Sequence, residues 1–307
     1  MTKVLVATVK PFAPAAVNGI REVIEGAGYE MVLLEKYENQ QALADAVSDA
    51  DAMIVRSDLA DAAVIGAAAN LKIIVRAGAG YDNVDLQAAT ARGMVVMNTP
   101  GQNSNAVAEL ALGMMVYMAR NQFNGTSGRE LKGKKLGIHA YGNVGRLVAM
   151  IAKGFGMECF AFDPFISKED IEKDGVRALN SVEELYSQCQ YISLHIPANE
   201  QTRGSINYEL LSSMPKGATL INTARKEVVC EKSLLRIYAD RSDFTYISDI
   251  APDCQAEIAA NYPGRFLFTP KKMGAQTAEA NINAGIAAAK QIVSFLENGD
   301  TTFQVNK

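Results

Sequence analysis

Residues 135–146 read KLGIHAYGNVGR, and this stretch says most about the fold. A strand-like run, LGI, leads into a turn in which Ala140, Gly142 and Gly145 stand at the spacing G-x-G-x-x-G, and an apolar segment of helical period follows. Gly142 lets the backbone approach a pyrophosphate, Gly145 lets the helix pack closely on the strand, and the helix N-terminus directs its amide groups at the anion. The stretch therefore predicts a dinucleotide-binding turn, although the first glycine of the pattern is an alanine here.

An acidic residue, Asp163, ends the next strand-like run, ECFAFD at 158–163. A carboxylate at this point can accept hydrogen bonds from both ribose hydroxyls and repels a 2′-phosphate, so the expected cofactor is NAD rather than NADP. The structural alternative is that Asp163 only shapes a turn before Pro164.

Short strand-like runs alternate with helix-length segments along the rest of the chain. Before the turn they lie at 4–9, 52–56, 72–78 and 94–98, and after it at 158–163, 191–197, 218–225, 244–251 and 266–270. Strands separated by helices pair in parallel, so the pattern predicts an α/β protein with two Rossmann-like, doubly wound parallel-sheet domains. A long helical segment ends at Gly299, and the tail 301–305 is expected to return to the first sheet as a strand. The nucleotide-binding domain, 101–276, is then inserted into a discontinuous domain, 1–100 and 277–307.

Composition excludes several classes of protein. The 307 residues are 49% hydrophobic and 21% charged, with a net charge of −4, which is ordinary for a globular chain and unlike disordered, collagenous or membrane sequences. No Lys/Arg run is long enough to attract nucleic acid or anionic lipid strongly, so neither is an expected partner. The N-terminus lacks the features of a signal sequence, and the four cysteines show no C-x-x-C spacing. We therefore expect reduced thiols, no metal site and a cytoplasmic location.

One helical segment, 103–120, is apolar nearly all round. Such a helix has to be buried, either by its own domain or by a partner. Because residues 106–118 are too uniformly hydrophobic to cover one domain and face water, we expect a homodimer formed through this part of the nucleotide-binding domain.

Further segments match one family at consistent spacing: RAGAGYDNVD at 76–85, NTPGQNSNAVAELALGMM at 98–115, SLHIP at 193–197, INTARKEVV at 221–229 and GAQTAEA at 274–280. Over nearly its whole length the chain resembles the D-isomer-specific 2-hydroxyacid dehydrogenases. The resemblance implies a substrate-binding domain interrupted by the NAD-binding domain, with the active site in the cleft between them. The pair Arg56-Ser57, and Arg76 before the 77–80 loop, are most similar to family members that oxidise 3-phospho-D-glycerate with NAD in serine biosynthesis.

The resemblance also assigns roles to individual residues. It places the substrate against Arg56, Ser57, Arg76, Ala77, Gly78 and Arg225. It places the cofactor against Ala79, Gly142, Asn143, Val144, Gly145, Asp163, His195, Pro197, Thr223, Ala224, Asp249, Gly274 and Ala275. The choice of arginine at 225 has a chemical reason, because a planar guanidinium holds a 2-hydroxy carboxylate bidentately and stays charged at any working pH.

The chain departs from the family where the proton is transferred. The family's glutamate position is Cys254 here, and its histidine position falls within TPKKMGA at 269–275, which contains no histidine. Counting back from Gly274-Ala275 puts Lys272 in the histidine place, whereas counting forward from Pro270 puts Lys271 there. We prefer Lys272, because the Gly-Ala-x-Thr anchor is longer.

A neutral lysine can take the hydroxyl proton as hydride leaves, provided that its pKa falls from the usual value of about 10.4. Burial and nearby positive charge lower a lysine pKa, whereas a glutamate beside the ammonium would raise it, so the joint absence of the glutamate and the histidine is chemically coherent. Asp253 or Glu257 remains an alternative for the missing carboxylate.

A phosphorylated substrate requires cations away from Arg225. Arg56 and Arg76 are the candidates, and salt bridges to helix carboxylates are the alternative for both. Arg129 and Lys132–Lys135 are further candidates if they act across a dimer.

The chain ends soon after its last helical segment, so we expect no regulatory domain and no serine feedback through one. Two other functions stay open. One is a reductase for glyoxylate, hydroxypyruvate or another D-2-hydroxyacid, and the other is a non-catalytic, NAD-sensing dimeric scaffold.

Overall fold

The structure, a computed structural model, describes every residue from Met1 to Lys307. The chain folds into two compact units, each described here by itself. Unit 1 comprises Met1–Asn103 and Gln276–Lys307, and unit 2 comprises Ser104–Ala275. The first boundary between the units lies after Asn103, three residues beyond the predicted boundary at 100, because helix α5 begins at Ser104 and belongs wholly to unit 2.

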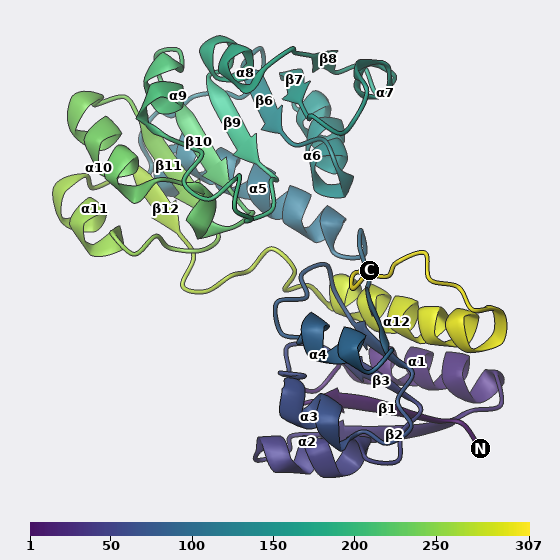
Figure 1. Cartoon of the computed structure of the whole chain (residues 1–307). Coiled ribbons are helices and arrows are strands. Elements are labelled where there is room, and N and C mark those ends of the chain that lie inside the picture. Colours follow the sequence, from purple (N-terminus) through teal and green to yellow (C-terminus); the bar gives the residue numbers. More distant parts are fainter. The chain divides into compact units, whose positions relative to one another are not determined.

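Unit 1 is built on five parallel strands in the order β2-β1-β3-β4-β5. The strands are β1 Lys3–Thr8, β2 Glu30–Glu35, β3 Ala52–Val55, β4 Ile73–Arg76 and β5 Val95–Asn98. Helices α1 Pro14–Gly26 and α12 Ala278–Asn298 cover one face, and α2 Gln40–Val47, α3 Ala62–Ala67 and α4 Leu86–Ala91 cover the other (Figure 1). Alternate residues of the central strands enter the two cores, which is why these strands read as continuous apolar runs.

Helix α12 lies near the C-terminal end of the chain but packs in unit 1, whose other elements come from the first 103 residues. Its N-cap is Thr277, whose hydroxyl accepts the Ala280 N–H, and its C-cap is Gly299 in the left-handed region (φ 67°), so the predicted end of this helix is correct. The helix packs on α1 at glycine contacts: a Cβ on Gly285 would lie 2.8 Å from Ile20 Cδ1, and one on Gly19 would lie 2.6 Å from Ile286 Cδ1. These glycines set how closely the two helices approach.

The C-terminal tail returns to the first sheet, but not as the full strand that we expected. It forms a single antiparallel bridge, between Gln304 and Met97 of β5. Asn306 fixes the tail to β5 through its side chain, which accepts from the Val96 N–H and donates to the Met94 carbonyl, both at 2.8 Å. A buried amide side chain thus replaces the backbone ladder of a strand.

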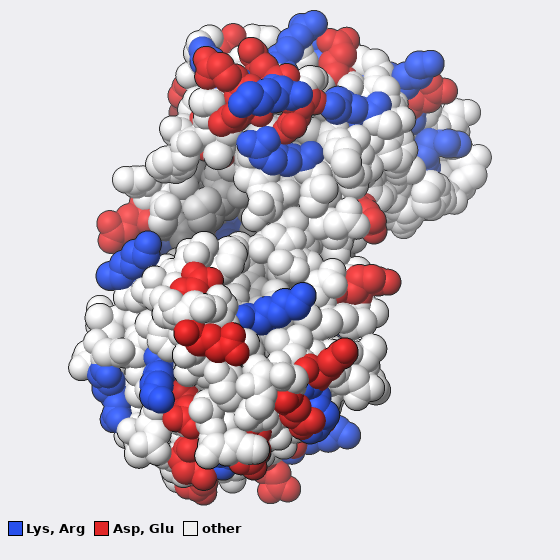
Figure 2. Space-filling model, turned by 90° about the vertical axis from the view of Figure 1, so that its right-hand side faces the viewer, with Lys and Arg blue, Asp and Glu red and all other residues white.

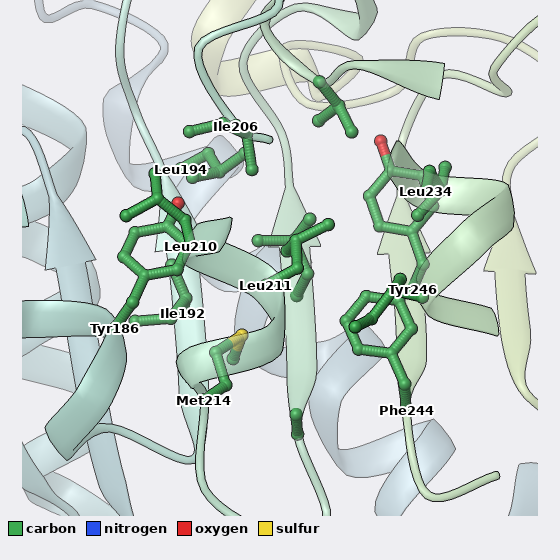
Figure 3. Close-up of a cluster of buried hydrophobic side chains, with 14 of the residues drawn as sticks. Tyr186, Ile192, Leu194, Ile206, Leu210, Leu211, Met214, Leu234, Phe244 and Tyr246 are labelled. Atoms are coloured by element: carbon green, nitrogen blue, oxygen red, sulfur yellow. The ribbon is translucent and has the colours of Figure 1, made fainter. Parts of the chain in front are cut away.

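Unit 2 is built on seven parallel strands in the order β12-β11-β10-β9-β6-β7-β8. The strands are β6 Lys135–His139, β7 Glu158–Phe162, β8 Arg177–Ala178, β9 Tyr191–Leu194, β10 Thr219–Asn222, β11 Thr245–Ser248 and β12 Phe266–Phe268. Helices α5 Ser104–Ala119, α6 Asn143–Gly154 and α7 Lys168–Glu172 pack on one face; α8 Val182–Gln188, α9 Tyr208–Ser213, α10 Glu231–Asp240 and α11 Gln255–Asn261 pack on the other. Figure 3 shows the second of these cores, with Leu211, Leu234 and Tyr246 among its side chains. The strand order reverses between β6 and β9, which is where ligands bind in doubly wound sheets.

Helix α5 is covered mainly by its own unit, which corrects the premise of the expected dimer. Eight of its residues are buried, five of them in the core of unit 2, Leu112 and Met115 included, and the helix packs on α6. Asn105, Glu109 and Gly113, one turn apart, form its exposed side. The uniform apolar character of the segment is therefore satisfied without a second chain.

No helix is both long and apolar enough to cross a membrane. On the face drawn in Figure 2, Lys and Arg lie interspersed with Asp and Glu. Exposed pairs such as Arg21–Glu25, 2.6 Å apart, place opposite charges next to each other.

Candidate active site

The glycine turn lies at the carboxyl end of β6, where the sequence pattern predicted it. Ala140 takes the left-handed backbone (φ 77°) that the pattern normally gives to glycine, and Gly142 is the N-cap of α6. A Cβ on Gly145 would overlap the Ala140 carbonyl oxygen, whereas one on Gly142 would meet no atom within 4 Å. Gly145 thus serves close helix packing, and Gly142 leaves open space in front of a helix N-terminus that has no side-chain cap. This cradle fits a pyrophosphate.

Asp163 follows β7 and is partly exposed. Its carboxylate accepts the N–H of Tyr141 at 2.7 Å and the N–H of Phe165 at 2.8 Å. The residue therefore does shape the turn before Pro164, as the structural alternative holds, and it also fixes the glycine turn. A carboxylate has further acceptor positions, so both roles are compatible with binding a ribose.

The loop after β10 holds Thr223, Ala224 and Arg225. Buried Asn222 organises it, because its side chain accepts the Ala224 N–H and donates to the Arg225 carbonyl, both at 2.9 Å. The Thr223 hydroxyl oxygen is buried and has no hydrogen-bond partner. An unpaired buried hydroxyl is costly in a finished site, which fits a place that a cofactor completes.

Lys272, the predicted acid/base residue, has three hydrogen-bond acceptors around its Nζ. Its Nζ donates to the carbonyl oxygens of Ala224 (2.8 Å) and Thr223 (3.3 Å), and it pairs with Asp249 Oδ1 at 3.1 Å. The Lys272 side chain is 39% exposed, whereas that of Asp249 is fully buried. The second oxygen, Asp249 Oδ2, accepts the Gly274 N–H at 2.9 Å. The chain thus gathers Arg225, Asp249 and Lys272 at the carboxyl ends of β10 and β11.

The electrostatic surroundings of Lys272 act in opposite directions. Burial lowers the pKa of its amine below the ordinary value, and the Arg225 guanidinium lowers it further. The Asp249 carboxylate opposes both, and Glu227 adds to that opposition. From the sequence, Asp249 was expected only to contact the cofactor. Asp249 and Lys272 are 23 positions apart, so no local pattern signals that they form an ion pair.

The other candidates for proton transfer lie elsewhere. Lys271 is exposed. Asp253 is 76% exposed and pairs with Lys226 at 2.5 Å, and Glu257 is exposed on α11. Cys254, in the family's glutamate position, is a thiol whose pKa burial raises to about 12. Of the carboxylates considered, it is Asp249 that contacts Lys272.

Both histidines of the chain lie at the ends of the neighbouring strands β6 and β9. Burial lowers the pKa of His139 to about 4 and that of His195 to about 3. His195 Nε2 lies 3.0 Å from the Ser193 hydroxyl, and the backbone N–H of His195 donates to the His139 carbonyl at 2.9 Å. Two partly buried imidazoles, kept neutral near pH 7 by their lowered pKa, lie at this edge of the sheet. Pro197, which follows, accepts the Thr202 hydroxyl on its carbonyl.

In unit 1, two of the predicted substrate residues are tied together. Arg76 Nε donates to the Arg56 carbonyl at 2.9 Å, and Arg56 Nη2 donates to Asn281 Oδ1 of α12 at 2.5 Å. A Cβ on Gly78 (φ 144°) would overlap the Arg76 guanidinium, so glycine is required for the arginine to lie over this loop. Ala77 is buried, and the Ala79 carbonyl accepts the Asn98 amide at 2.6 Å.

A cavity of about 360 Å³ opens at the carboxyl ends of β1, β2 and β3. Ser57 is the one predicted substrate residue that lines it. The other lining residues are Val9, Lys10, Tyr37, Glu38, Asn39, Gln40, Asp58 and Leu59.

A seven-stranded parallel sheet in this order, with a glycine turn after its first strand, defines a dinucleotide-binding α/β protein. Residues 106–259 match the family description "D-isomer specific 2-hydroxyacid dehydrogenase, NAD binding domain". The chain belongs to this family, as the resemblance of its motifs predicted.

Individual relatives agree in fold and length to different degrees. The NAD+-bound 3-phosphoglycerate dehydrogenase of Entamoeba histolytica is 49% identical, with a TM-score of 0.89 and coverage of 100% of this chain and 99% of that one. The rat D-3-phosphoglycerate dehydrogenase is 33% identical over 93% of this chain, which spans 56% of the rat protein's length. A hydroxypyruvate reductase of Thermotoga maritima is also 33% identical, over 86% of this chain and 90% of that protein.

Proposed function

We propose that this protein is an NAD-dependent dehydrogenase that oxidises 3-phospho-D-glycerate to 3-phosphohydroxypyruvate, the first step of phosphorylated serine biosynthesis. The observation that carries the proposal is the cluster of Arg225 and Lys272 at the sheet edge that also carries the glycine turn. The similarity to the Entamoeba histolytica enzyme over the whole chain supports the choice of substrate.

NAD, when bound, supplies the nicotinamide ring that accepts the hydride. The residues that would hold it are those of the cradle described above. The amides of Asn143 and Val144 begin α6 beside Gly142 and Gly145, and Asp163 lies at the next strand end. Along the sheet edge follow His195, Thr223, Asp249 and the Gly274-Ala275 loop, of which the unpaired Thr223 hydroxyl most plainly lacks a partner.

The protein's own groups bind the substrate and move one proton. The Arg225 guanidinium holds the carboxylate of the hydroxy acid, because a planar cation matches two carboxylate oxygens. The neutral amine of Lys272 takes the hydroxyl proton onto Nζ as the carbon loses hydride. In the reverse direction the Lys272 ammonium returns this proton to the carbonyl oxygen.

The phosphate is assigned to Arg56 and Arg76 of unit 1. The hydrogen bond to Asn281 and the glycine at 78 hold these side chains in place, so that little conformational entropy remains to be lost on binding. Ser57 and the 77–78 backbone complete the proposed contacts.

The test of this assignment is the activity of Arg56→Ala and Arg76→Ala on phosphorylated and unphosphorylated substrates. Each charge-assisted contact is worth about 1.5–3 kcal/mol, so each variant should lose roughly tenfold or more in kcat/KM on 3-phospho-D-glycerate and much less on D-glycerate. Equal losses on both substrates would overturn the phosphate assignment.

A reductase for hydroxypyruvate is the second candidate function. The specific observation in its favour is the Thermotoga maritima relative, which matches this chain over most of its own length. A homodimer formed through unit 2 and a cytoplasmic location are also proposed. Because α5 is covered mainly by its own unit, the dimer no longer rests on the apolar character of residues 106–118, and sedimentation at micromolar concentration tests it directly. Cell fractionation tests the location.

A further inference from the structure

The ammonium group of Lys272 has as many acceptors as it has protons. A lysine ammonium carries three donors and no acceptor, and the three oxygens around this one belong to Thr223, Ala224 and Asp249. A neutral amine has only two N–H bonds, so it could not donate to all three oxygens. The hydrogen-bond arrangement therefore matches the protonated form of Lys272.

Asp249 holds the loop that carries Lys272 at three points. Its carboxylate oxygens accept from Lys272 and from the Gly274 N–H, on either side of Met273. Its carbonyl accepts the Thr269 hydroxyl at 2.8 Å. A Cβ on Gly274 would lie 3.0 Å from Asp249 Oδ2, so the loop fits closely against this carboxylate. Since Asp249 is fully buried, it is a rigid anchor rather than a mobile surface charge.

Resting on the proposed function, we propose that Asp249 is the positioning residue of the acid/base lysine: its buried carboxylate aims Lys272 and keeps it protonated until substrate oxidation requires the free amine. The charged groups that face Lys272 are Asp249 from the end of β11, Arg225 from the loop after β10 and Glu227 from the short helix η2 Lys226–Val228. Arg225 disfavours the ammonium, and the two carboxylates favour it. Asp249 is the carboxylate in direct contact.

The protonation state of Lys272 differs between the two directions of the reaction. In reduction of the keto acid, an N–H bond of Lys272 breaks and its proton passes to the carbonyl oxygen while hydride reaches the carbon from the reduced cofactor. In oxidation, Lys272 first releases a proton to solvent, and its lone pair then takes the hydroxyl proton while hydride leaves to the oxidised cofactor. Asp249 thus keeps the resting enzyme in the form that reduction uses.

The test is the acetylation of Lys272 by acetic anhydride as a function of pH, measured by mass spectrometry on the protein without cofactor. Only the neutral amine reacts, so the midpoint reports the protonation of Lys272 directly. Lys271, adjacent and exposed, is an internal control in the same peptide. Asp249→Asn removes the charge and keeps the shape. Asp253→Asn is the matched control, because that carboxylate is exposed and pairs with Lys226 instead.

In Asp249→Asn the midpoint of Lys272 should fall by about 1 to 3 pH units, the effect of losing an opposite charge in contact, while that of Lys271 stays. The rate of alcohol oxidation should rise at correspondingly lower pH. An unchanged Lys272 midpoint would overturn the inference, as would an equal fall in Asp253→Asn.

Asp249→Glu separates charge from position and remains informative if the asparagine variant does not fold. The midpoint should stay near that of the wild type, whereas kcat should fall because the longer side chain displaces Lys272; an unchanged kcat would contradict the positioning role. Failure of the proposed function is recognised separately, by full activity of Lys272→Ala, a result that leaves the midpoint shift in Asp249→Asn standing.

Discussion

Single residues decide the proton chemistry of this protein. The sequence identifies a lysine where the family has histidine, and the Gly274-Ala275 anchor selects Lys272 over Lys271. In the structure Lys272 contacts Asp249 while Lys271 is exposed. The partnership itself could not be predicted, because only folding brings the ends of β11 and the 269–275 loop together.

Replacement of Lys272 by alanine tests its role in proton transfer. We expect kcat to fall by roughly 10² to 10⁴, the usual contribution of a positioned acid/base group, with little change in NAD affinity. In the wild type the oxidation rate should climb with pH through the lowered pKa of Lys272, because the base must be neutral, and the reduction rate should fall over the same range. Steady-state rates in both directions measure this.

Lys271→Ala is the control for the register of this assignment. It should keep nearly full activity. An inactive Lys271→Ala together with an active Lys272→Ala would move the acid/base role by one residue, and activity in both variants would refute a lysine base.

Asp163 tests the assignment of the ribose site. NAD should bind much better than NADP to the wild type, because the carboxylate repels a 2′-phosphate. Asp163→Ala should weaken NAD by about 1.5–3 kcal/mol and narrow the difference between the cofactors. Calorimetric dissociation constants for both cofactors measure it, and equal affinities in the wild type would exclude this role for Asp163.

At the scale of elements, two glycines in the turn from β6 into α6 have different roles: Gly145 allows close packing, and Gly142 is proposed to leave room for the cofactor. Gly145→Ala places a methyl group against backbone, so it should destabilise the protein by about 1–3 kcal/mol. Gly142→Ala meets open space and should change stability by less than about 0.5 kcal/mol, yet weaken NAD at least about tenfold because the methyl group fills the cradle. Urea unfolding and calorimetry distinguish the two effects, and normal NAD affinity in Gly142→Ala would place the pyrophosphate elsewhere.

Elements with a strong local pattern were predicted, and those without one were not. Strands β3 and β4 were identified correctly from their apolar runs, and the end of α12 was identified from Gly299. Strand β2 was missed, because Glu30–Glu35 is an edge strand with a single buried residue and only one β-branched residue. Strand β8 has two residues and no pattern to find. The apolar segment of α5 was recognised as buried, but periodicity does not tell which surface covers it.

For the whole molecule, the sequence was sufficient for the class of fold and the discontinuous order of the units, because strand–helix alternation restarts at the glycine turn. The proposed chemistry uses residues of both units: Arg56 and Arg76 come from unit 1, and Arg225 and Lys272 come from unit 2. The proposed substrate carries a phosphate and a carboxylate, the two groups that these arginines are proposed to bind.

The most direct test of that account is the rate of NADH formation by the wild-type protein with NAD and 3-phospho-D-glycerate, compared with D-glycerate at the same concentrations. We predict turnover of the phosphorylated acid with a kcat/KM at least about tenfold higher, since a charge-assisted phosphate contact contributes about 1.5–3 kcal/mol. Absence of NADH formation from 3-phospho-D-glycerate, or an equal or higher kcat/KM for D-glycerate, would contradict it.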